Sequence, residues 1–351
     1  MKIAQVCHRY HPFIGGVETH VKEISERMVL LGNEVEVLTT DLGGKLPQTE
    51  MLNGVKITRF RSFAPGEAYY LSPMIYFYLK SNGYDVVHAH NYHALPAFFA
   101  GMGKGRCKFV FTPHYHRGGH TFLRNLLHKP YKLFGKMIFS RADNIVCVSE
   151  YEKGLVSEDF VLPPGKIRKI PNGINLAEFR NVRLDLKKGD GNKLLYVGRL
   201  EEYKGVQYII QALLYLPDHS LSVIGKGPFE HDLRELADKL GVASKVEWLK
   251  DVSRKELLKH YVSADVFLML SKHEAYGITV AEALASGTLC IVALGSALDE
   301  FVDDEMCFGI DDYDPRILSS IIKRLKYNDT VPNTIADWND VVHELVDLYE
   351  E

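Results

Sequence analysis

Short β-branched or apolar runs alternate with segments of helical periodicity along nearly the whole chain, and this alternation limits the possible folds most strongly. In the first half, the runs predict strands at residues 2–7, 34–40, 55–60, 85–90, 108–113 and 144–149. In the second half, they predict strands at residues 193–198, 220–225, 245–249, 266–270 and 289–293. Strands that are separated by helices pair in parallel, with helices on both faces of the sheet. The pattern therefore predicts α/β domains with doubly wound sheets.

The pattern is interrupted once and then restarts, which predicts two domains. The interruption is LPPGKIRKIPNGIN, near residues 163–175, whose three prolines and two glycines favour a connecting segment. We therefore expect a first domain over residues 1–170 and a second over residues 171–330. Apolar residues at helical spacing predict an amphipathic helix within residues 331–351, with the option that it crosses back to the first domain. Ligands bind outside the carboxyl ends of strands in open α/β sheets, so two facing domains predict a cleft.

Composition is that of an ordinary globular protein. The chain has 351 residues, of which 46% are hydrophobic and 25% are charged, so it can bury sizeable cores. Its five cysteines are scattered without metal-ligand spacing, and we interpret them as reduced, mostly buried thiols. The first residues become polar too soon for a signal peptide, and no long apolar run follows. We expect a cytoplasmic protein, either free or peripheral on the inner face of the membrane.

Charge is divided unevenly between the two halves. Residues 1–170 contain 22 Lys and Arg against 14 Asp and Glu, whereas the remainder contains 20 against 31. One interpretation is that two domains diverged in charge and complement each other. The other interpretation is that the first domain meets an anionic surface or substrate.

The most informative motif of the second half is SKHEAYGITVAEALASG, residues 271–287, directly after a predicted strand. Seven residues separate Glu274, in the turn, from Glu282, inside the following helix. Carboxylates in such a place can accept hydrogen bonds from sugar hydroxyls. The structural alternative for Glu274 is that an acid near a helix N-terminus stabilises the helix dipole.

Further loops at strand ends carry candidate residues. YVGRLEEYKG places Arg199 and Lys204 between a strand and the next helix, where two cations can bind a diphosphate. GKGP, which begins at Gly225, is too short to be specific and is also consistent with a tight turn before a helix. In the first half, Gly15 and Gly16 precede a predicted helix, which indicates a close approach or unusual backbone angles.

Taken together, these motifs resemble the retaining glycosyltransferases of family four. The resemblance extends almost from end to end, through GGVETH, TPHYH, ADNIVCVSEYEK, IPNGIN, YVGRLEEYKG, GKGP and the Glu274/Glu282 pair. It implies the GT-B fold of two facing Rossmann-like domains, and transfer of a hexose from a UDP- or GDP-linked sugar to a hydroxyl acceptor, lipid-linked or glycan. It implies no cofactor and no metal, because fixed cations and helix dipoles can stabilise the departing diphosphate. We expect no nucleic-acid partner.

The resemblance also implies roles for individual residues. Arg199 and Lys204 would hold the diphosphate, Glu282 would bind the ribose hydroxyls, and Glu274 would contact the donor sugar. The expected donor-binding residues are Gly15, Gly16, Arg199, Lys204, Gly225, Glu274 and Glu282. His114, at the carboxyl end of a predicted strand, matches the family's histidine near the hydroxymethyl group of the donor sugar. The expected catalytic residues are His114, Glu274, Arg199 and Lys204.

Some parts of the chain fit the family pattern less closely. His116 and His120 follow His114, but a histidine in a loop is more often structural than catalytic. Late in the second domain the chain reads ALGSALDEF, where family members commonly have a glycine pair, a proline and an acid; Glu300 is the acid that could serve there. No carboxylate nucleophile stands out in the first domain, which favours attack on the face from which the diphosphate leaves.

Other classes of protein stay open. An epimerase or a phosphorylase can use the same architecture, although a phosphorylase needs a cofactor lysine that is not evident. An NAD-dependent dehydrogenase is disfavoured, because no G-x-G-x-x-G follows the first strand. A nucleotide-sugar-binding protein without turnover would share the fold.

One segment of the basic half mixes apolar and cationic residues. It reads FLRNLLHKPYKLFGKMIFSR over residues 122–141. Such a segment could lie on an anionic bilayer and place the acceptor side near a lipid-linked substrate. Alternatively, its apolar residues pack on the domain's own sheet while its lysines are solvated. The cations concerned are Arg124, Lys129, Lys132, Lys136 and Arg141.

Overall fold

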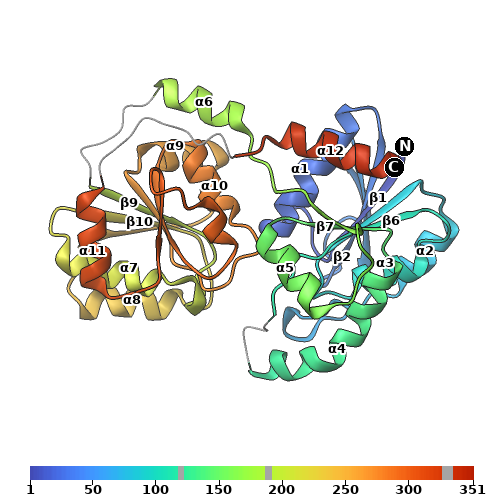
Figure 1. The fold of residues 1–351 in the computed structure, drawn as a ribbon, viewed down its shortest axis with the longest axis horizontal. Helices are drawn as coiled ribbons and strands as arrows, with labels where there is room; N and C mark the ends of the chain where they lie inside the picture. Colours follow the sequence, from blue (N-terminus) through green and yellow to red (C-terminus); the bar gives the residue numbers. More distant parts are fainter. Residues whose placement is uncertain (118–121, 186–191, 326–334) are drawn as a thin grey trace. The chain divides into compact units, whose positions relative to one another are not determined.

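The computed structural model describes residues 1–117, 122–185, 192–325 and 335–351. The chain divides into two compact units (Figure 1). The first unit comprises Met1–Asn172 together with Trp338–Glu351, and the second comprises Gly173–Asp337. Each unit has its own sheet and its own buried core.

The sheet of the first unit has eight strands in the order β3-β4-β2-β1-β5-β6-β7-β8. Its strands are β1 (Lys2–Val6), β2 (Glu34–Asp41), β3 (Thr49–Leu52), β4 (Val55–Arg61), β5 (Val86–His90), β6 (Lys108–Thr112), β7 (Asn144–Cys147) and β8 (Ile167–Lys169). The six predicted strands of this half are confirmed and pair in parallel. The prediction missed two short edge strands: β3, which is antiparallel to β4, and β8, which lies inside the proline- and glycine-rich segment.

Helices join the parallel strands of this sheet, and one helix returns from the far end of the sequence. They are α1 (Gly16–Leu30), η1 (Pro65–Glu67), α2 (Met74–Ser81), α3 (Pro96–Gly103), α4 (Phe122–Arg141), α5 (Glu150–Asp159) and α12 (Trp338–Glu350). Helix α12 lies beside α1 (Figure 1). The hydroxyl of Tyr349 in α12 is hydrogen-bonded to Gln5 and His88, at 3.3 and 2.6 Å, so the end of the chain is held in the core of the first unit.

The sheet of the second unit is wholly parallel, with six strands in the order β11-β10-β9-β12-β13-β14. Its strands are β9 (Lys193–Val197), β10 (Ser220–Ile224), β11 (Val246–Leu249), β12 (Val266–Met269), β13 (Leu289–Ala293) and β14 (Cys307–Ile310). The five predicted strands are confirmed, and β14 was missed. Its helices are α6 (Leu176–Asp185), η2 (Glu202–Lys204), α7 (Val206–Ala212), η3 (Leu213–Tyr215), α8 (Glu230–Lys239), η4 (Ala243–Lys245), α9 (Arg254–Ser263), α10 (Ile278–Ala285), η5 (Ala297–Phe301) and α11 (Pro315–Arg324).

The strand order places the motifs of each unit at the carboxyl ends of its central strands. In the second unit β9 lies between β10 and β12. The chain continues from β9 to β10 and β11 on one side of the sheet, and from β12 to β13 and β14 on the other side. Such a switch point is where open α/β sheets bind ligands. The YVGRLEEYKG loop follows β9 and the SKHEAYG loop follows β12, so both lie at this switch point. In the first unit β1 holds the equivalent place, between β2 and β5.

Candidate donor site and histidine cluster

A buried tyrosine of the same motif holds the loop after β9 in place. Tyr196 is fully buried, and its hydroxyl donates a hydrogen bond to the backbone carbonyl of Arg199 at 2.8 Å. The side chain of Arg199 is 64% exposed and pairs with Glu201 at 2.8 Å. The guanidinium group is therefore held near the end of β9 but is open to solvent, where it can meet an anionic ligand.

Lys204, in contrast, is half-buried and paired with an acid from the neighbouring loop. Its ammonium group donates to the carboxylate of Glu274, and the two side chains are 14% and 16% exposed. Burial alone would lower the pKa of Lys204, but the carboxylate of Glu274 outweighs it and raises the pKa. The backbone of Lys272 also donates to the carbonyl of Tyr203 at 3.0 Å, which joins the two loops. Lys204 therefore presents a permanent positive charge at the switch point.

Glu282, the second acid of the motif, lies inside α10 and is held by two donors. Nη1 of Arg254 donates to its Oε1 at 2.5 Å, and the hydroxyl of Tyr261 donates to its Oε2 at 2.8 Å. Arg254 opens α9, whose N-terminus has a capping box, and it also contacts Glu178 at 3.0 Å. Sequence reasoning missed Arg254 and Tyr261, since neither belongs to a motif and both reach Glu282 through tertiary packing.

Backbone packing explains why the GKGP turn contains two glycines, and the sequence did not reveal this packing. A Cβ atom on Gly225, whose φ is +150°, would lie 1.9 Å from the backbone oxygen of Gly198. A Cβ atom on Gly227 would lie 2.2 Å from the backbone oxygen of Leu200. The turn after β10 thus packs backbone to backbone against the Arg199 loop, and side chains at these two positions would displace that loop.

The two glycines before and at the start of α1 differ in how closely other atoms surround them. Gly15 precedes α1, and a Cβ atom there would lie 2.4 Å from Oε2 of Glu18. Among the residues that the structure describes, none has an atom within 4 Å of a Cβ added to Gly16, so their packing does not require a glycine there. Glu18 is buried in the first turn of α1 and pairs with Arg9 at 3.2 Å. The sequence analysis did not single out Glu18.

His114 follows β6 and is one of several histidines that gather at the carboxyl ends of the strands. Its φ of +46° lies in the left-handed region, which costs free energy in a non-glycine residue and is found at functional sites. Its ring centroid lies 5.2 Å from that of His20 and 6.2 Å from that of His90. Burial lowers the pKa of His20 to about 4, partly offset by the hydrogen bond that its ring donates to Asn172, and lowers the pKa values of His90 and His114 well below 6.5. These imidazoles are therefore neutral near pH 7.

A buried carboxylate supports the backbone beside His114. Glu152, in the first turn of α5, accepts hydrogen bonds from the backbone N–H groups of Tyr115 at 2.6 Å and Val148 at 2.7 Å. It thereby joins the loop after β6 to the end of β7. Burial raises the pKa of Glu152 to about 7, although the two backbone hydrogen bonds oppose this shift.

The remaining candidates are less informative. His116 is half-buried, and its ring stacks on that of His93 with centroids 4.0 Å apart. His120 lies outside the described residues. Glu300 is in η5 and is exposed.

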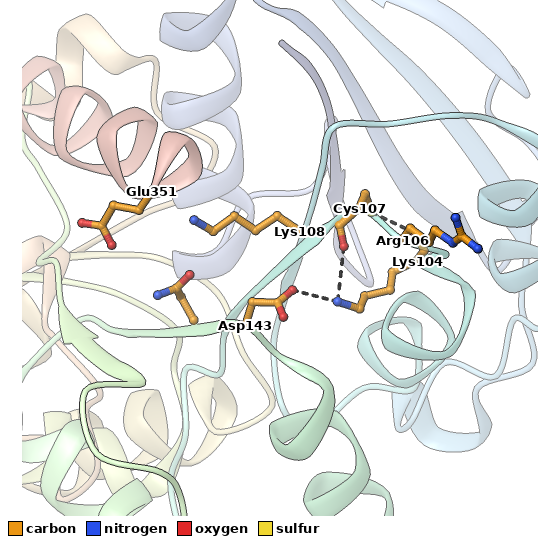
Figure 2. A pocket seen from close by; sticks show the side chains of 7 residues that line it. Lys104, Arg106, Cys107, Lys108, Asp143 and Glu351 are labelled. Carbon is orange, nitrogen blue, oxygen red and sulfur yellow. Dashed lines mark hydrogen bonds and ion pairs between the residues drawn. The ribbon is translucent and has the colours of Figure 1, made fainter.

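A shallow pocket of about 530 Å³ lies at the amino ends of β6 and β7, whereas His114 follows the carboxyl end of β6. Its lining residues are Lys104, Arg106, Cys107, Lys108, Asp143, Asn144 and Glu351. Lys104 turns toward Asp143 and donates to its carboxylate at 2.7 Å (Figure 2). The pocket contains none of the predicted site residues.

Comparisons with known proteins agree with the motifs. Residues 14–178 match the model of the family described as Glycosyltransferase Family 4, and residues 180–337 match that of Glycosyl transferases group 1. An uncharacterised glycosyltransferase of Methanocaldococcus jannaschii is 29% identical, over 100% of this chain and 98% of that protein. The GDP-mannose:cellobiosyl-diphosphopolyprenol alpha-mannosyltransferase of Xanthomonas campestris is 25% identical, over 84% of this chain and 78% of that protein.

Solved structures match the fold over its full length. Sucrose-phosphate synthase from Thermosynechococcus elongatus has a TM-score of 0.82 at 20% identity, covering 99% of this chain and 98% of that one. Anabaena Alr3699/HepE has a TM-score of 0.79 at 15% identity, covering 100% of both chains. The two family models together span the chain from residue 14 to residue 337, and both parallel-sheet units match GT-B enzymes. The chain therefore belongs to the family-four glycosyltransferases and is a transferase enzyme with the GT-B fold.

Proposed function

We propose that the protein is a retaining hexosyltransferase that uses a UDP- or GDP-linked sugar. The observation that carries this proposal is the arrangement at the switch point of the second unit, where two cations and two acids come from the loops after β9 and β12. Arg199 and Lys204 would bind the diphosphate and stabilise the charge that develops as it leaves. Glu274 would contact the sugar and Glu282 the ribose. No metal is needed at the diphosphate, because the cations are part of the fold.

Glu282 is well suited to bind a diol. Arg254 and Tyr261 each occupy one lone pair of its carboxylate, and a carboxylate has about four acceptor positions. The remaining lone pairs can accept hydrogen bonds from the two ribose hydroxyls without any change in the orientation of the side chain. The rigid carboxylate would thus lose little conformational entropy on binding.

Several related proteins support this choice of donor. Alr3699/HepE has been solved with UDP and glucose, and also with UDP-glucose. The Xanthomonas relative is named for GDP-mannose and for an alpha-mannosyl product. We propose that residues 171–330 bind the nucleotide sugar and residues 1–170 the acceptor, with Gly15, Gly16 and His114 on the acceptor side of the donor sugar.

The acceptor that we propose is a hydroxyl group on a lipid-linked molecule or a glycan. Relatives include an alpha-monoglucosyldiacylglycerol synthase of Streptococcus pneumoniae, 26% identical over 88% of this chain. No helix within the described residues is long and apolar enough to cross a bilayer. We propose instead that the protein binds the inner face of the cytoplasmic membrane through α4.

The second half of α4 has both features that such contact needs. Leu133, Phe134 and Met137 are exposed, Lys132 is half-exposed and Lys136 is exposed beside them. The opposite side of the helix is packed, because Tyr131, Ile138 and Phe139 are buried in the core of the first unit. The packed side agrees with the alternative that apolar residues of the segment pack within the domain, and the exposed side supports the membrane contact that we propose. The side chains of Arg124 and Lys129 lie outside the described residues.

Incubation of the purified protein with UDP-, GDP- and ADP-linked hexoses, with and without polyprenyl diphosphate sugar acceptors, tests the proposal. We expect one donor to stabilise the protein, by roughly 2.7 kcal/mol at a hundred times its dissociation constant. With an acceptor, nucleoside diphosphate should be released and the product should keep the anomeric configuration of the donor by NMR. Binding without release would favour the non-catalytic alternative, and an altered donor sugar without release would favour an epimerase.

A further inference from the structure

Three histidines from different elements of the first unit meet at one point. His20 comes from the second turn of α1, His90 ends β5, and His114 follows β6. One ring nitrogen of each lies within 4.8 Å of the other two. His20 and His90 are almost fully buried and His114 is half-buried, so the cluster has one side toward solvent.

Each of the three rings has a buried nitrogen without a hydrogen-bond partner among the residues that the structure describes. These atoms are Nε2 of His20, Nδ1 of His90 and Nε2 of His114. A buried polar atom without a partner costs about 1–3 kcal/mol, and such atoms are uncommon in folded proteins. Three such atoms on three neighbouring rings point to a ligand-binding site.

In two of the rings, a hydrogen bond at the other nitrogen determines which of the two ring nitrogens carries the proton. Nδ1 of His20 lies 2.6 Å from Oδ1 of Asn172, and Nε2 of His90 lies 2.8 Å from Oε1 of Gln5. An amide oxygen only accepts, so each of these ring nitrogens must be the N–H donor. The unpartnered nitrogens of His20 and His90 therefore carry lone pairs, which can bind a metal ion.

We propose that His20, His90 and His114 bind one divalent transition-metal ion of the Zn²⁺ class, with a fourth coordination position left for an oxygen ligand. Three neutral imidazoles and one open position form a known type of zinc site. Asn172 and Gln5 are the outer partners that orient metal-binding histidines in such sites. Tetrahedral Zn–N bonds of about 2.0–2.1 Å bring the nitrogens to roughly 3.4 Å from one another, so the rings would close by about 1 Å on binding.

The proposed ion is separate from the diphosphate site. The residues that we assign to the diphosphate belong to the second unit, whereas all three ligands belong to the first. The ion would fasten α1 to the ends of β5 and β6, next to the Gly15–Gly16 loop. An imidazole has two nitrogens, so a metal on one ring nitrogen of His114 leaves the other for a hydrogen bond to a sugar hydroxyl.

Metal content and cobalt spectroscopy on the full-length protein test the proposal without any activity assay. The chelator-treated protein would be titrated with Zn²⁺ by calorimetry and with Co²⁺ by visible absorption. We expect about one ion per chain, and a Co²⁺ spectrum with the intense bands of tetrahedral coordination. His20→Gln and His90→Gln should each weaken Zn²⁺ binding at least about 100-fold, and Asn172→Ala, which keeps all three ligands, about 10- to 100-fold.

His116→Gln is the matched control, since this neighbouring histidine stacks on His93 and lies outside the cluster. It should bind Zn²⁺ like the wild type. Circular dichroism of each metal-free variant checks the fold. The wild-type cobalt spectrum needs no variant, so the proposal stays testable if a variant does not fold. Weak, substoichiometric binding by the wild type, an octahedral Co²⁺ spectrum, or unchanged affinity in folded His20 and His90 variants would overturn it.

Discussion

The ammonium group of Lys204 and the carboxylate of Glu274 form a partly buried ion pair across seventy residues of sequence. The pair joins the loops after two adjacent parallel strands, β9 and β12, at the switch point of their sheet. A carboxylate that fixes a cation in this way preorganises it for an anionic ligand, because the cation does not have to be ordered when the ligand binds.

Removing either cation should slow the reaction while leaving the fold intact. We expect Arg199→Ala and Lys204→Ala each to lower kcat by about a hundredfold or more, the typical cost of losing one donor to developing charge. Steady-state kinetics with the preferred donor measure this effect. Lys239→Ala, an exposed lysine of α8 that pairs with Glu235, is the matched control and should keep wild-type kinetics. Rates within a few fold of wild type in both test variants would refute the diphosphate assignment.

Arg254 should matter for donor affinity although it belongs to no motif. Its removal leaves the buried Glu282 with only Tyr261 as a donor, so we expect Arg254→Ala to raise the KM for the donor about tenfold, with a smaller change in kcat. The free energy of unfolding should fall by about 1–3 kcal/mol, the cost of a buried group that loses its partner. Lys255→Ala, the next residue in α9, is the control. A KM unchanged in Arg254→Ala would mean that Glu282 has a purely structural role.

Gly16 offers a test that separates ligand approach from folding. An alanine there would begin a helix and meet no atom of the described part of the chain within 4 Å, so we expect Gly16→Ala to be as stable as wild type or up to about 1 kcal/mol more stable. If a substrate approaches this backbone, kcat/KM should nevertheless fall at least about tenfold, which corresponds to about 1.4 kcal/mol. Gly83→Ala, also free of close contacts, should change neither quantity. Normal activity in Gly16→Ala would show that no substrate comes close to this residue.

Glu152 should make stability fall as the pH rises. Its pKa is about 7 in the folded protein against 4.5 for an ordinary glutamate, so the folded state holds the proton more tightly than the unfolded state. Its contribution to stability is therefore fully present below about pH 4.5 and is lost as the pH rises through 7. The loss amounts to roughly 3 kcal/mol.

Urea unfolding of wild type and Glu152→Gln between pH 4.5 and 8 isolates this contribution, because other titrating groups cancel in the difference. We expect the stability of wild type relative to Glu152→Gln to decrease over this range. Glu150→Gln, an exposed acid of the same helix, is the control and should give a flat difference. A flat difference for Glu152→Gln as well would show that folding does not raise the pKa of Glu152.

Membrane contact through α4 should depend on salt and on lipid charge. We expect the protein to sediment with anionic vesicles at low salt, to be released at high salt, and to ignore neutral vesicles. Replacing Lys132 and Lys136 by Glu should abolish sedimentation, whereas replacing Lys239 and Lys323 of the second unit should not. Equal partitioning to neutral and anionic vesicles, or none to either, would point to a soluble acceptor.

The class of the fold and the motifs of the proposed donor site can be recognised in the amino-acid sequence. Runs such as KIAQV and KLLYV are strands because their side chains need burial, and the helical segments between them force parallel pairing. Arg199, Lys204 and Glu274 could be placed at strand ends for the same reason. The short edge strands β3, β8 and β14 were missed. Each has only a few residues and pairs with a single neighbouring strand, so its sequence shows too little apolar patterning to be recognised as a strand.

Tertiary structure alone decided which of these residues meet. Periodicity describes a residue's neighbours along the chain, whereas the pairing of Arg254 with Glu282 and the convergence of His20, His90 and His114 depend on the order of the strands and the packing of the helices. Tyr349 shows the same limit, since its contact with Gln5 crosses almost the whole sequence. A local sequence pattern does not predict such contacts, because they depend on how whole faces of helices and sheets are buried.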